Sequence, residues 1–175
     1  TDINAYAAQI ATLNARIVEA QGLNSQPPND LLDQRDQVIS QLNDLINVSI
    51  GKQTDGSYNV FIGTGQPLVT GLTANTLTLT DDTLEQGKKN VSFIFGNTAV
   101  VIPQQSLETG GALGGLLAFR RTSLETAQNA LGRIALGFAQ SFNEQHQLGQ
   151  DLNGVLGGRF FNIDATSPTI SGATG

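Results

Sequence analysis

The sequence predicts an α+β fold: an elongated helical rod of three main helices, one of them long, with a small antiparallel β unit inserted between helices. Two observations predict it. Near both ends of the chain, apolar residues recur at alternating spacings of three and four, which is the periodicity of a helix that packs along a narrow stripe. Between residues 48 and 103 the period changes to two, as in β-strands, and turn residues separate the apolar runs.

The first predicted helix covers about 19 residues at the start of the chain. We expect Gly22 to end it and Gln26-Pro27-Pro28 to form a stiff connection, because proline lacks the amide donor that a helix interior needs. The apolar stripe of this helix consists of Ile3, Tyr6, Ile10, Leu13, Ile17 and Ala20.

A second helix follows, and we expect Asn29 or Asp30 to cap its amino end. The short connection predicts that the two helices lie antiparallel. The apolar face of the second helix is formed by Leu32, Ile39, Leu42 and Ile46, and it is widened by Leu31, Val38 and Leu45.

The β unit is predicted for residues 48–103. Its clearest signal is a hairpin, in which Val48 and Ile50 precede a turn at Asp55-Gly56 and a second alternating run follows. Further short strands are expected around Leu68-Val69, Leu77–Thr80, Val91–Phe95 and Val100–Ile102.

The third helical region keeps the three-four spacing from Leu113 to Leu148. A helix of about 36 residues is ~54 Å long, whereas a compact globule of this length is ~40 Å across, so we expect an elongated molecule. The predicted domains are a discontinuous helical rod domain (1–47 and 104–150), the β unit (48–103), and a loop (151–175) that begins an outer domain mostly absent from the chain. The chain is expected to be a piece of a longer protein.

The candidate functional residues form a helix-packing seam, which is either core of this chain or a surface for partner helices. They are Ile3, Tyr6, Ile10, Leu13, Ile17, Leu32, Ile39, Leu42, Ile46, Leu117, Leu124, Leu131, Ile134 and Phe138.

The composition argues against several classes of function. Charged residues make up only 14%, while Asn, Gln, Ser and Thr number 57 of 175, so the surface is expected to be amide and hydroxyl in character. A net charge of −6 opposes binding to nucleic acid or to an anionic membrane. With no Cys and one His, the chain lacks thiolate nucleophiles, thiolate metal ligands and multi-His metal sites, although a Ser-His-Asp set could still use His146. We favour no catalytic, cofactor or metal site.

Four motifs resemble functional sites, and a structural interpretation is favoured for each. Gly110–Gly115 matches no phosphate-binding spacing, and it suits a tightly packed or flexible helix start better. Asp81 and Asp82 are adjacent in a strand and therefore face opposite sides. The run from Asp151 to Gly154 lacks the bidentate Glu of a calcium loop and indicates a turn. His146 is expected to cap a helix or form surface hydrogen bonds.

Four segments occur in an order that places the β unit between the second helix and the long one. They are Asn29-Asp-Leu-Leu-Asp-Gln-Arg-Asp36, Gly114-Gly-Leu-Leu-Ala-Phe-Arg120, Ala127-Gln-Asn-Ala-Leu-Gly-Arg-Ile-Ala135 and Phe142-Asn-Glu-Gln-His-Gln-Leu-Gly-Gln-Asp-Leu-Asn-Gly154. Together they resemble the flagellar hook-associated protein 1 family, whose members join hook to filament in bacteria.

This resemblance implies a structural subunit, exported through the flagellar channel without a cleaved signal and assembled outside the cell, and it implies no enzyme activity. The expected partners are further copies in a ring, the hook protein and the filament-side junction protein. The family's polymerising terminal helices lie outside this chain, so the isolated fragment is expected to be monomeric. The alternative is another axial flagellar protein, either the second junction protein or a flagellin-like subunit. A glycan-acting enzyme or adhesin is disfavoured, because Trp is absent.

Overall fold

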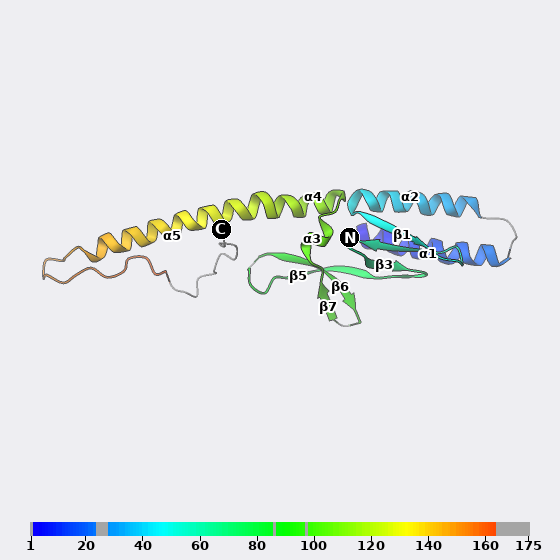
Figure 1. Ribbon diagram of the computed structural model, residues 1–175. Helices are drawn as coiled ribbons and strands as arrows, with labels where there is room; N and C mark the ends of the chain where they lie inside the picture. Colours follow the sequence, from blue (N-terminus) through cyan, green and yellow to red (C-terminus); the bar gives the residue numbers. More distant parts are fainter. Residues whose placement is uncertain (1, 24–27, 86, 97, 164–175) are drawn as a thin grey trace. The chain divides into compact units, whose positions relative to one another are not determined.

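The computed structural model describes residues 2–23, 28–85, 87–96 and 98–163, and it confirms the α+β class (Figure 1). The chain divides into two compact units, Thr1–Ala118 and Phe119–Gly175. Unit 1 contains two long helices, two β-sheets and two shorter helices, whereas unit 2 contains a long helix and the segment that returns along it. Residues 24–27 and 164–175, which include part of the predicted proline connection and of the predicted loop, lie outside the described residues.

Unit 1 begins with a helical hairpin formed by α1 (Asp2–Leu23) and α2 (Asn29–Leu45). The two helices lie side by side and antiparallel, as predicted (Figure 1). The expectation that Gly22 ends the first helix is wrong, because α1 continues to Leu23. A glycine in the last turn of a helix adds little cost where the rest of the helix is held by packing.

The expectation that the side chain of Asn29 or Asp30 caps α2 is also wrong. Pro28 occupies the N-cap position, and no side chain caps the helix. The Pro28 carbonyl instead accepts hydrogen bonds from the amides of Leu31 (3.0 Å) and Leu32 (3.1 Å). Because proline fixes its own φ near the helical value, it starts the helix without help from Asn29 or Asp30.

The strands form two antiparallel sheets. The first has the order β1-β2-β3-β4, with β1 Val48–Lys52, β2 Tyr58–Ile62, β3 Gln66–Thr70 and β4 Thr73–Ala74. The second has the order β5-β6-β7, with β5 Thr76–Asp81, β6 Lys89–Phe95 and β7 Thr98–Val101. The predicted hairpin is confirmed, since β1 pairs with β2 in a register that places Ile50 opposite Val60.

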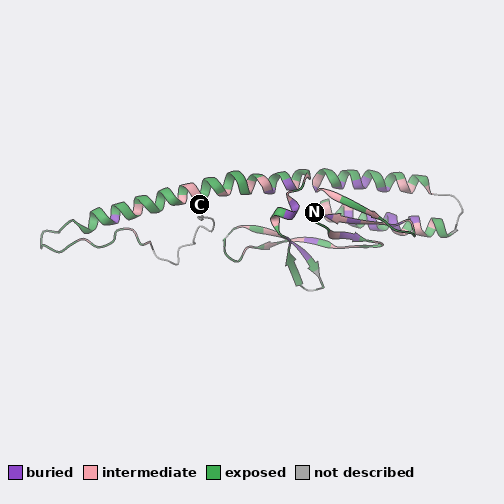
Figure 2. Cartoon of the chain, viewed as in Figure 1, coloured by how far each residue is buried: buried purple, intermediate pink, exposed green. Residues whose placement is uncertain are grey.

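The core of unit 1 lies where the helical hairpin covers the first sheet. Buried residues of α1 and α2 face buried residues of β2 and β3 (Figure 2). The second sheet is tied to α1 by Asn4, whose amide donates to the Leu77 carbonyl (2.8 Å) and accepts from the Leu77 amide (2.9 Å). The buried residues of this core include Ala7, Ile10, Leu13, Val38, Ile39, Leu42, Val60, Ile62, Leu68, Val69, Leu77 and Phe93.

Two short helices complete unit 1: α3 (Gln104–Leu107), which the pattern did not predict, and α4 (Gly111–Phe119). Gly111 has φ +71°, and a Cβ there would lie 2.6 Å from the Ile46 amide nitrogen. A Cβ on Gly114 would lie 2.9 Å from the Leu107 carbonyl oxygen. Of the two structural interpretations of the glycine-rich run, a tightly packed or a flexible helix start, the structure supports the tightly packed one.

Unit 2 consists of a π-helical segment, η1 (Arg120–Leu124), the helix α5 (Glu125–Gln147), and a return segment that reaches Ile163. The return segment runs back beside α5 (Figure 1). Helical residues thus cover the predicted region, but a π segment interrupts its α-helical hydrogen bonding. Within residues 119–163, Asn143 is the one buried residue, so this described part of unit 2 has no hydrophobic core of its own.

Candidate functional site

The predicted seam residues of unit 1 are core or lie at its edge. Buried members are Ile10, Leu13, Ile17, Ile39, Leu42, Ile46 and Leu117, and half-buried ones are Ile3, Tyr6 and Leu32. All of these residues except Ile17 and Leu32 belong to the core of unit 1 or pack against it, so they are not free for a partner helix in this structure.

The seam residues of unit 2 lie in a different environment. Leu131, Ile134 and Phe138 on α5 are 68%, 69% and 64% exposed, and Leu124 in η1 is exposed as well. Apolar residues at three-four spacing on one helix are expected to be covered by another helix. This exposed stripe of α5, which we call the α5 stripe (Leu131, Ile134 and Phe138), is the candidate packing surface.

The sequence pattern missed a second apolar surface, an aromatic cluster beside the α5 stripe. The Phe142 ring lies 5.1 Å from that of Phe160 and 5.4 Å from that of Phe161, between centroids. Phe138 joins the cluster, since its ring centroid lies 6.0 Å from that of Phe161. The adjacent pair Phe160-Phe161 was the signal that the return segment contacts α5.

Asn143 holds this cluster together. Its side-chain oxygen accepts hydrogen bonds from the amides of Phe160 and Phe161, each at 2.8 Å, and its side-chain nitrogen donates to the Phe161 carbonyl at 2.8 Å. A single side chain thus satisfies three backbone groups of the return segment. It fixes where the two phenylalanines rest on α5.

His146 forms a surface hydrogen bond, in agreement with the structural interpretation. Its Nδ1 lies 2.8 Å from the Gly158 carbonyl oxygen, and its ring stacks on Phe142 with centroids 6.1 Å apart. Because a carbonyl only accepts, Nδ1 carries the proton and donates it.

Arg35 is a buried charged residue that the sequence pattern did not indicate. It is 1% exposed, and its guanidinium carbon lies 3.3 Å from the centroid of the Tyr58 ring. Its Nη1 donates to the Asn14 side-chain oxygen (3.1 Å) and to the Gly56 carbonyl (2.8 Å). The available signal was its position: Arg35 lies four residues after Leu31 and three before Val38, on the apolar side of α2.

Asn14 extends this network into the sheet. It is fully buried, and its side-chain nitrogen donates to the carbonyls of Tyr58 (2.8 Å) and Gly71 (2.7 Å). Its oxygen accepts from the Tyr58 amide as well as from Arg35. Two helices and two turns of the first sheet therefore meet at Asn14 and Arg35, and this arrangement fixes how the helical hairpin sits on the sheet.

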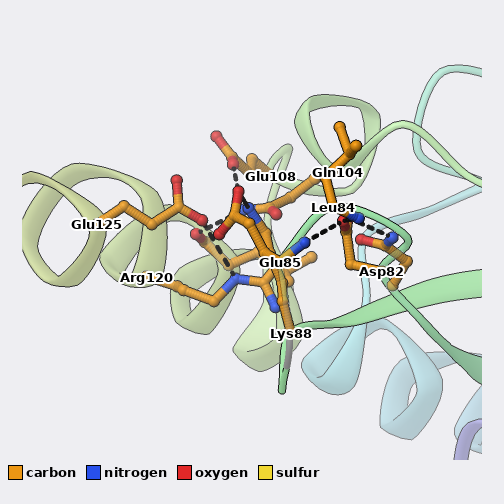
Figure 3. Close-up of polar contacts among 10 residues, drawn as sticks. Asp82, Leu84, Glu85, Lys88, Gln104, Glu108, Arg120 and Glu125 are labelled. Carbon is orange, nitrogen blue, oxygen red and sulfur yellow. Dashed lines mark hydrogen bonds and ion pairs between the residues drawn. The ribbon is translucent and has the colours of Figure 1, made fainter. Parts of the chain in front are cut away.

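The adjacent residues Asp81 and Asp82 have different partners, so they do not form a carboxylate pair. Asp81 pairs with Lys89 across β5 and β6, whereas Asp82 caps the turn between these strands (Figure 3). The Asp82 carboxylate accepts hydrogen bonds from the Asn90 side chain (2.9 Å) and from the amides of Leu84 (2.8 Å) and Glu85 (3.0 Å). These bonds, the one from Asn90 above all, lower the pKa of Asp82 to about 2.

Two further ion pairs, one in each unit, are drawn in Figure 3. The Lys88 ammonium lies 3.0 Å from the Glu85 carboxylate in the β5–β6 turn of unit 1. In unit 2, Arg120 Nε lies 3.8 Å from Glu125 Oε1, which spans the π segment η1. Both are partly exposed pairs of the kind that contribute little to stability.

The turn after α5 is held by Asp151. Its carboxylate accepts the amides of Asn153 and Val155, each at 2.8 Å, and the bonds with Val155 and Asn153 lower its pKa. The turn interpretation of this motif is thus supported by its geometry. Among the described residues, no group of acidic or histidine side chains is arranged to hold a metal ion. Nor does that part of the chain contain a helix long and apolar enough to cross a membrane.

Comparison with known proteins adds the family. The flagellar hook-associated protein FlgK helical domain matches residues 1–161. This chain belongs to that family. Flagellar hook-associated protein 1 of Escherichia coli (strain K12) is 42% identical over 163 residues, and that of Salmonella typhimurium (strain LT2) is 42% identical over 172. Both carry the name that the four sequence segments indicated.

A solved structure shares the fold of the FlgK helical domain seen here. The flagellar hook junction protein FlgK from Burkholderia pseudomallei superposes with a TM-score of 0.76 at 39% identity and covers 94% of this chain. The alignments with the Escherichia coli and Salmonella typhimurium proteins cover 92% and 96% of this chain. The chain itself spans about 30% of the length of each of these two relatives and of the solved structure.

Proposed function

We propose that this chain is part of a structural subunit that joins hook to filament in the bacterial flagellum and acts by packing against neighbouring subunits, not by catalysis. Its family and its relatives, which are named for the hook and its junction, support this role. The single observation that carries the mechanism is the α5 stripe, whose three large apolar side chains are each more than 60% exposed.

The partners are other copies in a ring, the hook protein and the filament-side junction protein, and the location is the flagellum outside the cell. The uncharged polar surface of the chain supports permanent side-by-side packing, because burying an amide costs less free energy than burying an unpaired charge. We further propose that the fragment alone is a monomer.

Hook binding by the full-length protein tests the seam. Leu131→Asp and Phe138→Asp place a charge on the α5 stripe, and we expect each to weaken binding to isolated hooks by tenfold or more. Arg133→Ala, an exposed change on α5, is the control. If both Asp variants fold and bind hooks like the parent, the α5 stripe is not a packing surface.

The junction role has its own test. Electron microscopy of cells that lack the protein should show hooks without filaments, and the full-length protein should restore the filaments. Filaments that form normally on hooks without this protein would contradict the junction role, whatever the α5 stripe contacts.

A further inference from the structure

A short π-helical segment, η1, interrupts the helical run that covers residues 111–147. The residues on either side of η1 have ordinary α-helical backbone angles, since Phe119 has φ −59° and ψ −45° and Glu125 has φ −63° and ψ −38°. The departure from α-helical hydrogen bonding is therefore confined to Arg120–Leu124. Because π segments are a common cause of kinks in helices, η1 is the place where this run is expected to bend.

η1 contributes no buried side chain to a core. Arg120 is half-buried, and the other residues of the segment are exposed, including the apolar side chain of Leu124. When the backbone hydrogen bonds of an exposed segment open, water replaces them. Such a segment therefore opens at a lower free-energy cost than a helix that closes over a core.

The ion pair between Arg120 and Glu125 indicates what favours the π geometry. These residues are five positions apart, whereas ion pairs on an α-helix join residues three or four apart. A π turn bonds each amide to the carbonyl five residues earlier, so it brings positions i and i+5 to one side of the helix. The distance of 3.8 Å between Arg120 Nε and Glu125 Oε1 thus suits the π turn (Figure 3). As a partly exposed pair, it holds that turn only weakly.

The end of α4 is anchored independently of η1. The Leu117 side chain belongs to the core of unit 1, and the Gln104 side-chain nitrogen donates to the Leu117 carbonyl at 3.0 Å. In an α-helix this carbonyl accepts from the amide four residues later, and in a π turn from the amide five residues later, and both amides lie in η1. Because a carbonyl oxygen accepts two hydrogen bonds, Leu117 keeps a partner when the bonds of η1 open.

We propose that η1 is a hinge at which α5 bends relative to α4, while α4 stays fixed in unit 1. The boundary between the two compact units falls directly before η1, between Ala118 and Phe119. Bending within residues 120–124 therefore leaves the packing inside unit 1 and the contacts of α5 with its return segment intact. A hinge requires only a few residues at the end of an element to absorb the change in backbone angles.

The hinge deepens the proposed function, and its use rests on that proposal. A subunit that joins two different assemblies packs against neighbours of two kinds. A stiff helix would hold unit 1 and the α5 stripe in one arrangement, whereas a hinge lets the α5 stripe follow its own neighbours while unit 1 keeps its contacts.

Spin-label distances measured by electron paramagnetic resonance in the full-length protein test the hinge. These 175 residues contain no cysteine, and any cysteine elsewhere in the full-length protein is first replaced by serine. One pair of labels, at Ala112→Cys and Gln128→Cys, spans η1, and the matched control, at Gln128→Cys and Glu144→Cys, lies within α5. All of these sites are exposed, and both pairs have the same separation in sequence, which is about 24 Å along a helix.

We expect the distance distribution across η1 to be about twofold wider than the distribution within α5. Equal widths would show that the helix is as stiff at η1 as within α5, and they would overturn the hinge. This comparison needs no change in η1 itself, so it decides the question in a protein with its natural π segment.

A deletion assigns the motion to η1. Removing Ser123, an exposed residue, takes out the additional residue that a π turn encloses and should restore an uninterrupted α-helix. The distribution across η1 should then narrow to the width found within α5. A distribution that stays wide in the folded deletion variant would place the motion elsewhere and overturn the hinge. If the deletion unfolds the chain, the comparison of the two label pairs stands.

Hook binding by the cysteine-free parent is measured in parallel, because it separates the hinge from the proposed function. A parent that binds hooks but shows equal widths removes the hinge and leaves the proposed function. A parent that shows the wide distribution but does not bind hooks removes the proposed function and leaves the hinge as a property of the chain.

Discussion

At the scale of single residues, the Asn14–Arg35 network gives the sharpest prediction for stability. Asn14→Ala removes a partner from the Tyr58 amide, from the carbonyls of Tyr58 and Gly71, and from Arg35, all in the interior of unit 1. Because buried polar groups left without partners are costly, we expect a loss of about 2 kcal/mol or more in the free energy of unfolding. Urea denaturation measures it, with Thr12→Ala on the exposed side of α1 as a control within about 0.5 kcal/mol. Equal effects of the two changes would show that the network contributes no specific stability.

Asp82 gives a second residue-scale prediction, in its dependence on pH. Its hydrogen bonds lower the pKa from the usual 3.8 to about 2 in the folded state. A group whose pKa is lowered by folding stabilises the fold above its unfolded pKa and loses that contribution as the pH falls through the folded one. The stability difference between the parent and Asp82→Asn should thus be constant above about pH 5 and shrink between pH 4 and pH 2. Carboxyl NMR titration measures the pKa, and a value near 3.8 would refute the turn geometry.

At the scale of elements, the start of α4 tests close packing. Gly111→Ala must adopt a φ near +71° and place its Cβ 2.6 Å from the Ile46 amide nitrogen and 2.7 Å from the Ile46 Cα, both backbone atoms. We expect it to cost more than about 2 kcal/mol. The matched change Gly115→Ala meets nothing within 4 Å in the same helix and should stabilise by about 0.5–1 kcal/mol. Thermal melts of both variants decide the point, and a neutral Gly111→Ala would mean that α4 does not start against α2.

The elements themselves could be predicted because their periodicity is local. The helical hairpin, the β1–β2 hairpin and the helical region around Leu131 follow from spacings of two, three and four. The π segment η1 could not be predicted, since it adds a residue per turn and a heptad count assumes none. The division of the strands into two sheets depends on long-range pairing that no spacing records. Arg35 was missed because charge suggests exposure, although its place on the apolar side of α2 indicated burial.

At the scale of the whole molecule, the two units differ in what stabilises them. Unit 1 has a core shared by helices and sheets, whereas in residues 119–163 of unit 2 only Asn143 is buried. The packing within unit 2 is the half-covered aromatic cluster between α5 and its return segment. The candidate site therefore lies on the part of the chain with the least support of its own, as expected for a surface that is completed by assembly.

This difference predicts how the amides of the two units exchange with solvent. An isolated helix of about 20 residues is only marginally stable in water, so amides of α5 should exchange by local opening at low free-energy cost. Amides of α1 and α2, which close over the core, should approach the limit set by global unfolding. Hydrogen exchange measured by mass spectrometry on the free chain should show this contrast. It should also show slower exchange in α5 once the full-length protein is bound to hooks.

Asn143→Ala, which releases the return segment, should speed exchange in unit 2 and leave α1 unchanged. If α5 of the free chain were as protected as α1, unit 2 would be stable without partners, and the α5 stripe would need no covering helix.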